Sequence, residues 1–116
     1  MPESFERGAL TEAVYYILLS LYKPAHGYAI MQNINRLTGG RVILGPGTLY
    51  GAINSLTERN WIIGVVNTVT AGETRKKEYM ITDSGRAAVR LEMLRLEELL
   101  VNGKSITEEV RDARSN

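Results

Sequence analysis

Apolar residues along this chain recur at helical spacing in several segments and give way to a β-prone stretch in the middle. Residues 11–21 are apolar on nearly all sides, with Thr11 as a candidate N-cap, and predict a helix buried on more than one side. A proline and a glycine within residues 23–27 end it, and a second helix is predicted over residues 27–38. Two glycines follow, and residues 41–44 form a short β-prone run.

A third helix is predicted to open at the Gly-Pro-Gly-Thr sequence of residues 45–48 and to run to about Asn60. Leu49, Ala52, Ile53 and Leu56 have the i, i+3, i+4, i+7 spacing of an inward-facing stripe. The same 3.6-residue period turns the remaining side chains of this helix outward, and these are Thr48, Tyr50, Gly51, Asn54, Ser55 and Glu58.

Two β-prone runs follow, residues 61–69 and 75–81, joined by a turn that contains Gly72. Thr82 is expected to cap a long helix that ends near Gly103. The element order predicts a mainly α fold with a small β-hairpin (α+β), a winged helix-turn-helix with a long C-terminal dimerisation helix. The expected organisation is a DNA-binding region at residues 1–82, the dimerisation helix at residues 83–102 and a polar tail at residues 103–116.

Positive charge is concentrated in the middle of the chain, although the whole sequence of 116 residues has a net charge of only +1. Residues 23–77 contain seven basic and two acidic residues, whereas residues 1–22 and 78–116 are each net acidic. Such an asymmetry is expected when one face of a protein meets a polyanion.

Catalysis and cofactor chemistry find little support in the sequence. The chain has no cysteine, and its one histidine, His26, adjoins a turn where a structural or phosphate-facing role is expected. No acidic or histidine cluster has metal-ligand spacing, so neither an enzyme nor a cofactor or metal is predicted. No run approaches the ~20 apolar residues of a membrane span, and no signal peptide is evident, so a cytoplasmic location is expected.

Two segments are candidates for contact with DNA. The outward residues Thr48, Tyr50, Asn54 and Ser55 suit major-groove contact, with Gly51 permitting close approach; the alternative is an ordinary polar surface helix. The basic hairpin residues Arg75, Lys76 and Lys77 suit phosphates or a minor groove, or simply a charged tip that discourages aggregation.

The long helix bears two apolar stripes, whereas a helix at the edge of one small domain needs only one. Dimerisation with a second copy explains the second stripe, although packing on the chain's own first helix is an alternative. The expected dimer interface consists of Tyr15, Tyr16, Val89, Leu91, Met93, Leu94, Leu96 and Leu100. A tentative ligand pocket is assigned to Tyr15, Met93 and Leu94.

Three stretches, LLSLYKPAHGY, LGPGTLYGAINSLTERNWI and RKKEYMITDSGRAAV, resemble the PadR family of transcriptional regulators. The resemblance covers about residues 10–101 and is most specific at residues 47–50 and 79–85. It implies a winged-helix dimer that usually represses genes, often for detoxification of phenolic acids or drug efflux. In having a single C-terminal helix, the chain resembles a subgroup of shorter family members. Some members of that subgroup bind flat aromatic drugs at the dimer interface.

The resemblance also implies DNA-facing roles for particular residues. These are Thr48, Tyr50, Asn54 and Ser55 in the helix, Arg75, Lys76 and Lys77 in the wing, and Tyr28 near the phosphate backbone. The chain departs from the family in two places: Gly51 stands where many members have proline, and the last helix lacks the tryptophan of drug-binding relatives.

The sequence therefore predicts a homodimeric, sequence-specific DNA-binding regulator, a repressor of a palindromic operator relieved by a small hydrophobic or phenolic effector. The alternative is a winged-helix module for protein interaction or RNA binding, without operator recognition.

Overall fold

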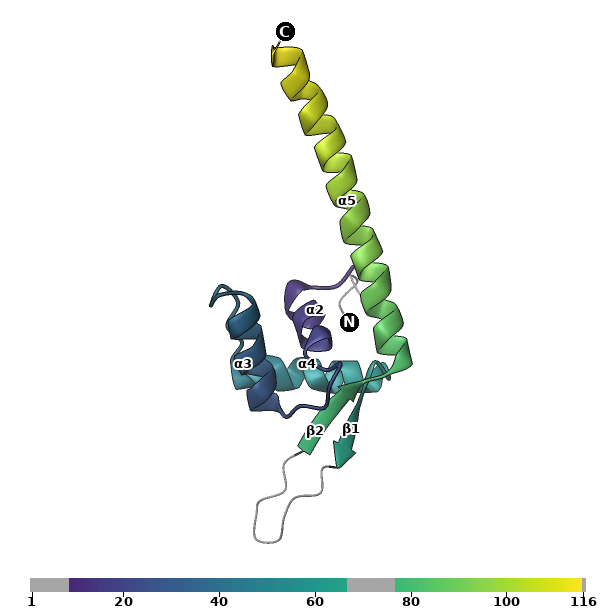
Figure 1. Ribbon diagram of the computed structural model, residues 1–116. Helices are drawn as coiled ribbons and strands as arrows, with labels where there is room; N and C mark the ends of the chain where they lie inside the picture. Colours follow the sequence, from purple (N-terminus) through teal and green to yellow (C-terminus); the bar gives the residue numbers. More distant parts are fainter. Residues whose placement is uncertain (1–8, 67–76, 116) are drawn as a thin grey trace.

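The computed structural model describes residues 9–66 and 77–115 (Figure 1). Three short helices form a bundle beside a two-stranded sheet, and a long last helix leaves the bundle at one end (Figure 1). The elements are, in order, α2 (Glu12–Leu19), α3 (Gly27–Leu37), α4 (Pro46–Glu58), β1 (Ile62–Val66), β2 (Lys77–Ile81) and α5 (Asp83–Ser115).

Each of the three short helices begins at a residue suited to that position. The Thr11 hydroxyl accepts the Val14 N–H at 3.2 Å, which caps α2 as predicted. The His26 ring accepts the Ala29 N–H through Nδ1 at 3.4 Å and caps α3. Gly45 precedes α4 without a side-chain cap, and Pro46 occupies the first turn, where its missing N–H costs nothing.

The core lies where α2, α3 and α4 meet the hairpin. The predicted inward stripe of α4 is confirmed, because Leu49, Ile53 and Leu56 are buried and Ala52 packs against them half-buried. The largest fully buried side chains are Ile17, Leu18, Leu21, Ile30, Ile34, Leu49, Ile53, Leu56 and Ile62.

The hairpin is antiparallel, with a register from Ile62 opposite Ile81 to Val66 opposite Lys77. The free edge of β2 takes up Ala25 from the α2–α3 turn, because Ala25 and Tyr79 exchange two backbone hydrogen bonds of 2.9 and 3.1 Å. The turn thus takes the place beside β2 that a third strand would occupy.

The β-prone run at residues 41–44 forms no strand, so that interpretation is wrong. The end of α3 uses its hydrogen-bonding groups instead: the Arg41 N–H bonds the Thr38 carbonyl at 3.1 Å, and the Val42 N–H bonds the Thr38 hydroxyl at 3.0 Å. Backbone N–H groups that are hydrogen-bonded locally cannot donate to a neighbouring strand.

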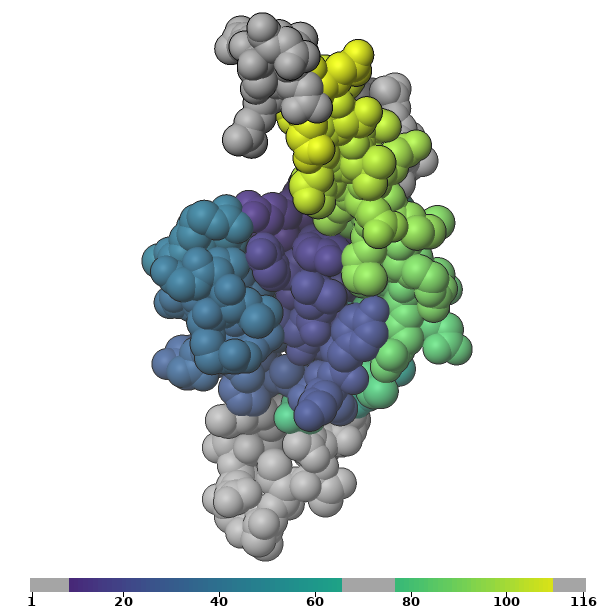
Figure 2. Space-filling view, turned by 45° about the horizontal axis from the view of Figure 1, so that its top comes forward, coloured from purple at the N-terminus to yellow at the C-terminus, as the bar shows by residue number. Residues whose placement is uncertain are grey.

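The last helix is longer than predicted. It runs unbroken over 33 residues to Ser115, through Gly103, so its predicted end at residue 102 and the separate tail are wrong. A glycine inside a helix costs about 1 kcal/mol relative to alanine, which the good helix formers around it offset. At 1.5 Å per residue α5 is about 50 Å long. Its distal part extends away from the bundle (Figure 1), and the yellow turns drawn in Figure 2 lie beyond the short helices.

The start of α5 is fixed against the start of β1. The Thr82 hydroxyl accepts the Gly85 N–H at 3.1 Å, which confirms Thr82 as the cap, and donates to the Asn60 carbonyl at 2.6 Å. Gly85 lies so close to Trp61 that a Cβ at this position would collide with the Trp61 carbonyl oxygen. Only glycine permits this approach of helix to backbone.

Replacing Gly85 by alanine is therefore expected to lower the free energy of unfolding by about 2 kcal/mol or more, because backbone atoms must move. The control is Gly103→Ala in the same helix, where a Cβ would meet nothing within 4 Å. That control should raise stability by about 0.5–1 kcal/mol through helix propensity. Urea unfolding followed by circular dichroism measures both, and equal effects of the two changes would contradict the packing assigned to Gly85.

Candidate nucleic-acid interface

The outward face of α4 is open, as the helical period predicts. Thr48, Tyr50, Gly51, Asn54 and Ser55 are all exposed. Within the described ranges, the side chains of Thr48, Asn54 and Ser55 make no hydrogen bond to other protein groups. Their donors and acceptors are therefore available to a ligand.

A groove runs between this face and the hairpin. It has a volume of about 370 Å³, and Asn54, Thr57 and Glu58 of α4 line one side, while Gly64 and Lys77 line the other. The Lys77 side chain lies across Gly64, where a Cβ would approach the lysine Cε to 3.1 Å. Polar α4 side chains and a basic strand residue thus open on the same groove.

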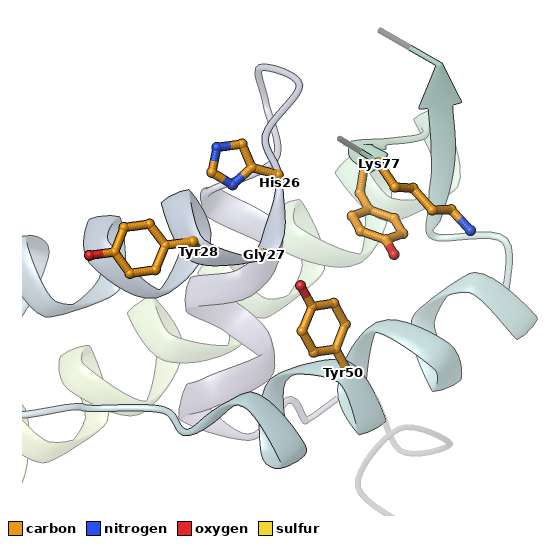
Figure 3. Close-up of a pocket in the computed structure, with 6 residues that line it drawn as sticks. His26, Gly27, Tyr28, Tyr50 and Lys77 are labelled. Atoms are coloured by element: carbon orange, nitrogen blue, oxygen red, sulfur yellow. The ribbon is translucent and has the colours of Figure 1, made fainter. Parts of the chain in front are cut away.

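A second cleft, of about 440 Å³, adjoins the first at Lys77 and Tyr79. It is lined by His26, which caps α3, by Tyr28 in the first turn of α3, and by Tyr50 from α4 (Figure 3). Tyr28 is 62% exposed and its ring points away from Tyr50 and Lys77 (Figure 3), whereas His26 is half-buried and caps α3. The structural role expected for His26 is confirmed.

Tyr50 does not extend straight outward from α4. Its hydroxyl lies against the first turn of α3, where a Cβ on Gly27 would collide with it (Figure 3). Gly27 therefore allows α3 and α4 to approach at this point. This position differs from the base-reading one that the sequence suggests for Tyr50, because the ring lies over the backbone of α3.

The predicted wing residues Arg75 and Lys76 lie outside the described residues, and Lys77 is the first residue of β2. One charge of the basic middle segment does not contribute to this interface, because Arg41 forms an exposed ion pair with Glu12 at the start of α2. Lys77 is the described cation that lines both grooves.

The base of α5 carries a third cavity, of about 350 Å³, between α2 and α5. Its lining residues include Tyr15, Tyr16, Glu92, Arg95 and Leu96. Glu92 is only 2% exposed and is held on two sides. Its carboxylate accepts the Leu10 N–H at 3.2 Å and two hydrogen bonds from the Arg95 guanidinium at 2.6 and 2.9 Å.

Comparison with protein families gives one clear result. The family model described as the transcriptional regulator PadR-like family matches residues 16–91, from α2 to the first third of α5. The chain belongs to the PadR-like family. A search of curated proteins found no match.

Solved structures share the winged-helix fold of this PadR-like chain. A transcriptional regulator from Clostridium thermocellum is similar at a TM-score of 0.62 and 24% identity, over 90% of this chain and 96% of that one. A PadR family transcriptional regulator from Eggerthella lenta has a TM-score of 0.63 and 22% identity, over 81% of this chain and 76% of that one. The circadian clock associated protein Pex from Anabaena has a TM-score of 0.56 and 18% identity, over 78% of this chain and 79% of that one.

One residue of the predicted dimer surface of this PadR-like chain needs correction, and the residues of the predicted ligand pocket lie in different surroundings. Val89 is 2% exposed and belongs to the core of its own chain, because it faces the bundle with Gly85 and Glu92. Of the three residues assigned to a ligand pocket, Tyr15 lines the cavity between α2 and α5, but Met93 and Leu94 do not and are exposed.

Sequence reasoning also missed Tyr79 and Glu92. Tyr79 follows Lys77 by two residues, so strand alternation alone places both on one face of β2. The residue type of Glu92 does not suggest a buried position, because a glutamate on a helix is usually solvated. Its spacing of seven from Gly85 and three from Val89 is the one indication that it faces the bundle.

Over residues 9–66 and 77–115, no helix is both long and apolar enough to cross a membrane. The same described ranges contain no group of three metal-ligating His, Asp or Glu side chains.

The Arg95 guanidinium lowers the pKa of the Glu92 carboxyl, burial opposes this shift, and the Leu10 N–H adds to the lowering. A carboxyl whose pKa is lowered in the folded state adds stability above its ordinary value of 4.5 and loses it as the pH falls further. Glu92→Gln should therefore reduce the free energy of unfolding by about 1–3 kcal/mol at neutral pH. Below the ordinary pKa of the carboxyl, the difference in unfolding free energy between Glu92→Gln and wild type should become smaller.

Urea unfolding at pH 7 and at pH 3 measures this difference. Glu98→Gln, on the exposed side of the same helix, serves as the control and should be nearly neutral at both. A gap that stays the same at both pH values would mean that the Glu92 charge does not stabilise the fold.

Proposed function

We propose that this chain is a sequence-specific DNA-binding regulator that acts as a homodimeric repressor. The observation that carries the proposal is the groove that the exposed polar side chains of α4 share with Lys77 of the hairpin. Recognition helix and wing flank a duplex in this way when the helix enters the major groove.

Base contact is assigned to Thr48, Asn54 and Ser55. Asn54 offers both a donor and an acceptor and pairs well with an adenine edge, while the hydroxyls of Thr48 and Ser55 suit either kind of base. Gly51, where a Cβ would meet nothing within 4 Å, leaves an open surface between them for close approach of the DNA.

Phosphate contact is assigned to residues that flank this face. Lys77 lies on the hairpin side, and the exposed ring of Tyr28 lies at the start of α3. Arg75 and Lys76 are assigned to the same role by their place in the sequence. Each cation that meets a phosphate releases counterions, so affinity should fall as salt rises.

Dimerisation is assigned to the part of α5 from Leu91 onward. Its large apolar side chains are 40–63% exposed in the single chain, and they are Leu91, Met93, Leu94, Leu96, Leu99, Leu100, Val101 and Ile106. So long an apolar surface on one helix marks an interaction site. A second copy covers it most simply, and Tyr15 and Tyr16 extend the surface at the base of α5.

An effector is assigned to the cavity between α2 and α5. Two tyrosines and Leu96 suit an aromatic ring such as that of a phenol, whereas the Arg95 guanidinium is already paired with Glu92. Binding there would press on both helices and so change how α5 holds the partner. Protein interaction or RNA binding without an operator is the second candidate, which the next experiment distinguishes.

Selection from a library of random duplexes should yield a palindromic site that binds the wild-type protein. Asn54→Ala should then lose about 5- to 100-fold in affinity for that site and much less for random DNA, because base contacts carry sequence preference. Asn102→Ala on exposed α5 is the control for the same chemical change. Failure to enrich any duplex would favour the protein or RNA alternative.

Leu94→Arg should shift the protein from dimer to monomer, because an arginine would be buried in an apolar interface. Light scattering measures the mass. Ile43→Arg, the same kind of change at an apolar side chain that is 72% exposed between α3 and α4, is the control and should leave the dimer intact. A dimer of unchanged affinity after Leu94→Arg would place the interface elsewhere.

A further inference from the structure

The cleft between α3, α4 and β2 contains a tyrosine hydroxyl whose position the core does not explain. Tyr79 is 9% exposed, yet its hydroxyl has no hydrogen-bond partner among the described residues. Every described polar side-chain atom that is sealed from solvent does have a partner. The Tyr79 hydroxyl is therefore not sealed, and it opens into the cleft that Tyr79 lines.

Two further polar groups reach the same cleft without a protein partner. Tyr50 is 44% exposed, and its hydroxyl makes no hydrogen bond within the described ranges. The Lys77 ammonium lies 5.6 Å from the centre of the Tyr79 ring and forms no ion pair with a described residue. Two hydroxyl donors and the Lys77 side chain thus line a space of about 440 Å³, and the Lys77 ammonium lies over Gly64 at the border with the adjoining groove (Figure 3).

This set of groups selects an anion rather than a cation or a neutral ring. Burial raises the pKa of the Tyr79 hydroxyl, and the neighbouring Tyr50 adds to the effect, so the hydroxyl stays protonated and is a donor at neutral pH. No described carboxylate lines the cleft. Hydrogen bonds from neutral donors to a charged oxygen are roughly twice as strong as those to a neutral one.

We propose that one backbone phosphate of DNA binds in this cleft, accepts hydrogen bonds from the Tyr50 and Tyr79 hydroxyls, and is neutralised by Lys77. The proposal rests on the DNA binding proposed above. The source of the phosphate follows from the adjoining groove, because Lys77 and Tyr79 line both spaces and Asn54 lines the second. A strand whose bases meet Asn54 would carry a phosphate past Tyr79.

The proposal gives the two tyrosines a different task from Asn54. Tyr79 and Tyr50 become positioning residues that set the register of α4 on the duplex, because phosphate contacts fix orientation without reading sequence. Tyr79 acts from within the hairpin, and its ring anchors the same contact in the core.

Tyr79→Phe tests the assignment, since it removes the hydroxyl and retains the ring. Affinity for the duplex selected with the wild-type protein should fall about 10-fold, and Tyr50→Phe should give a similar loss. The double variant should lose less than the product of the two losses, because both hydroxyls serve one phosphate. Tyr22→Phe, whose ring lies under Arg86 away from this cleft, is the matched control and should bind as wild type does.

A duplex series with one neutral methylphosphonate at each position gives a second readout that a loss of fold would not mimic. At one position the substitution should weaken Tyr79→Phe less than it weakens wild type, because the variant has already lost one of the three contacts to that phosphate. Equal binding by Tyr79→Phe and Tyr22→Phe, or equal sensitivity of wild type and Tyr79→Phe at every position, would overturn the phosphate site while leaving DNA binding standing.

Two remaining outcomes are also decisive. If Tyr79→Phe melts far below wild type, the exposed Tyr50→Phe variant and its methylphosphonate series decide the question alone. If wild type and Tyr22→Phe bind no selected duplex, DNA binding itself fails and the phosphate site fails with it.

Discussion

Three backbone hydrogen bonds between the α2–α3 turn and β2 hold together the side of the molecule that carries the two grooves. Ala25 and Tyr79 exchange two of them, and the Ile81 N–H donates the third to the Leu21 carbonyl at 2.8 Å. A ladder of this kind admits one register, because a slip by one residue would turn every side chain of β2 to the wrong face. Since α3 begins directly after Ala25, the same bonds set how far its first turn lies from Tyr79 and Lys77.

The other side of the molecule depends on α5, which connects the hairpin with the exposed apolar surface. Its first turn is held by the close approach of Gly85 to Trp61, and its third turn by the Glu92 carboxylate. Both contacts are short and leave little room for rotation of the helix about its axis. The cavity beside Tyr15 lies between these contacts and the free part of the helix.

Much of this architecture could be predicted from the sequence, because local signals and periodicity agree there. The Thr11 and Thr82 caps, the inward stripe of α4 and its open polar face all follow from spacing. The failures lie where a competing contact, or the lack of one, overrides the composition of the segment. Residues 41–44 have strand composition, but Thr38 takes their backbone groups and Ala25 takes the sheet edge. Gly103 suggested a helix end, yet nothing competes with the helix there.

The site divides in the same way. Exposure of Thr48, Asn54 and Ser55 follows from the helical period, whereas the close approach of Tyr50 to Gly27 depends on how two helices meet. The buried carboxylate of Glu92 and the open hydroxyl of Tyr79 are likewise products of tertiary packing. A single sequence does not reveal that a glutamate is buried or that a core tyrosine has an accessible hydroxyl.

The unbroken course of α5 makes it a lever. About 23 residues separate Glu92 from the end of the helix, which corresponds to an arm of about 35 Å. A tilt of only ~5° at its base would displace the far end by about 3 Å, close to the spacing of successive bases along one DNA strand. The leverage acts in both directions, so whatever grips the distal turns also controls, with reduced amplitude, the angle at which the bundle is held.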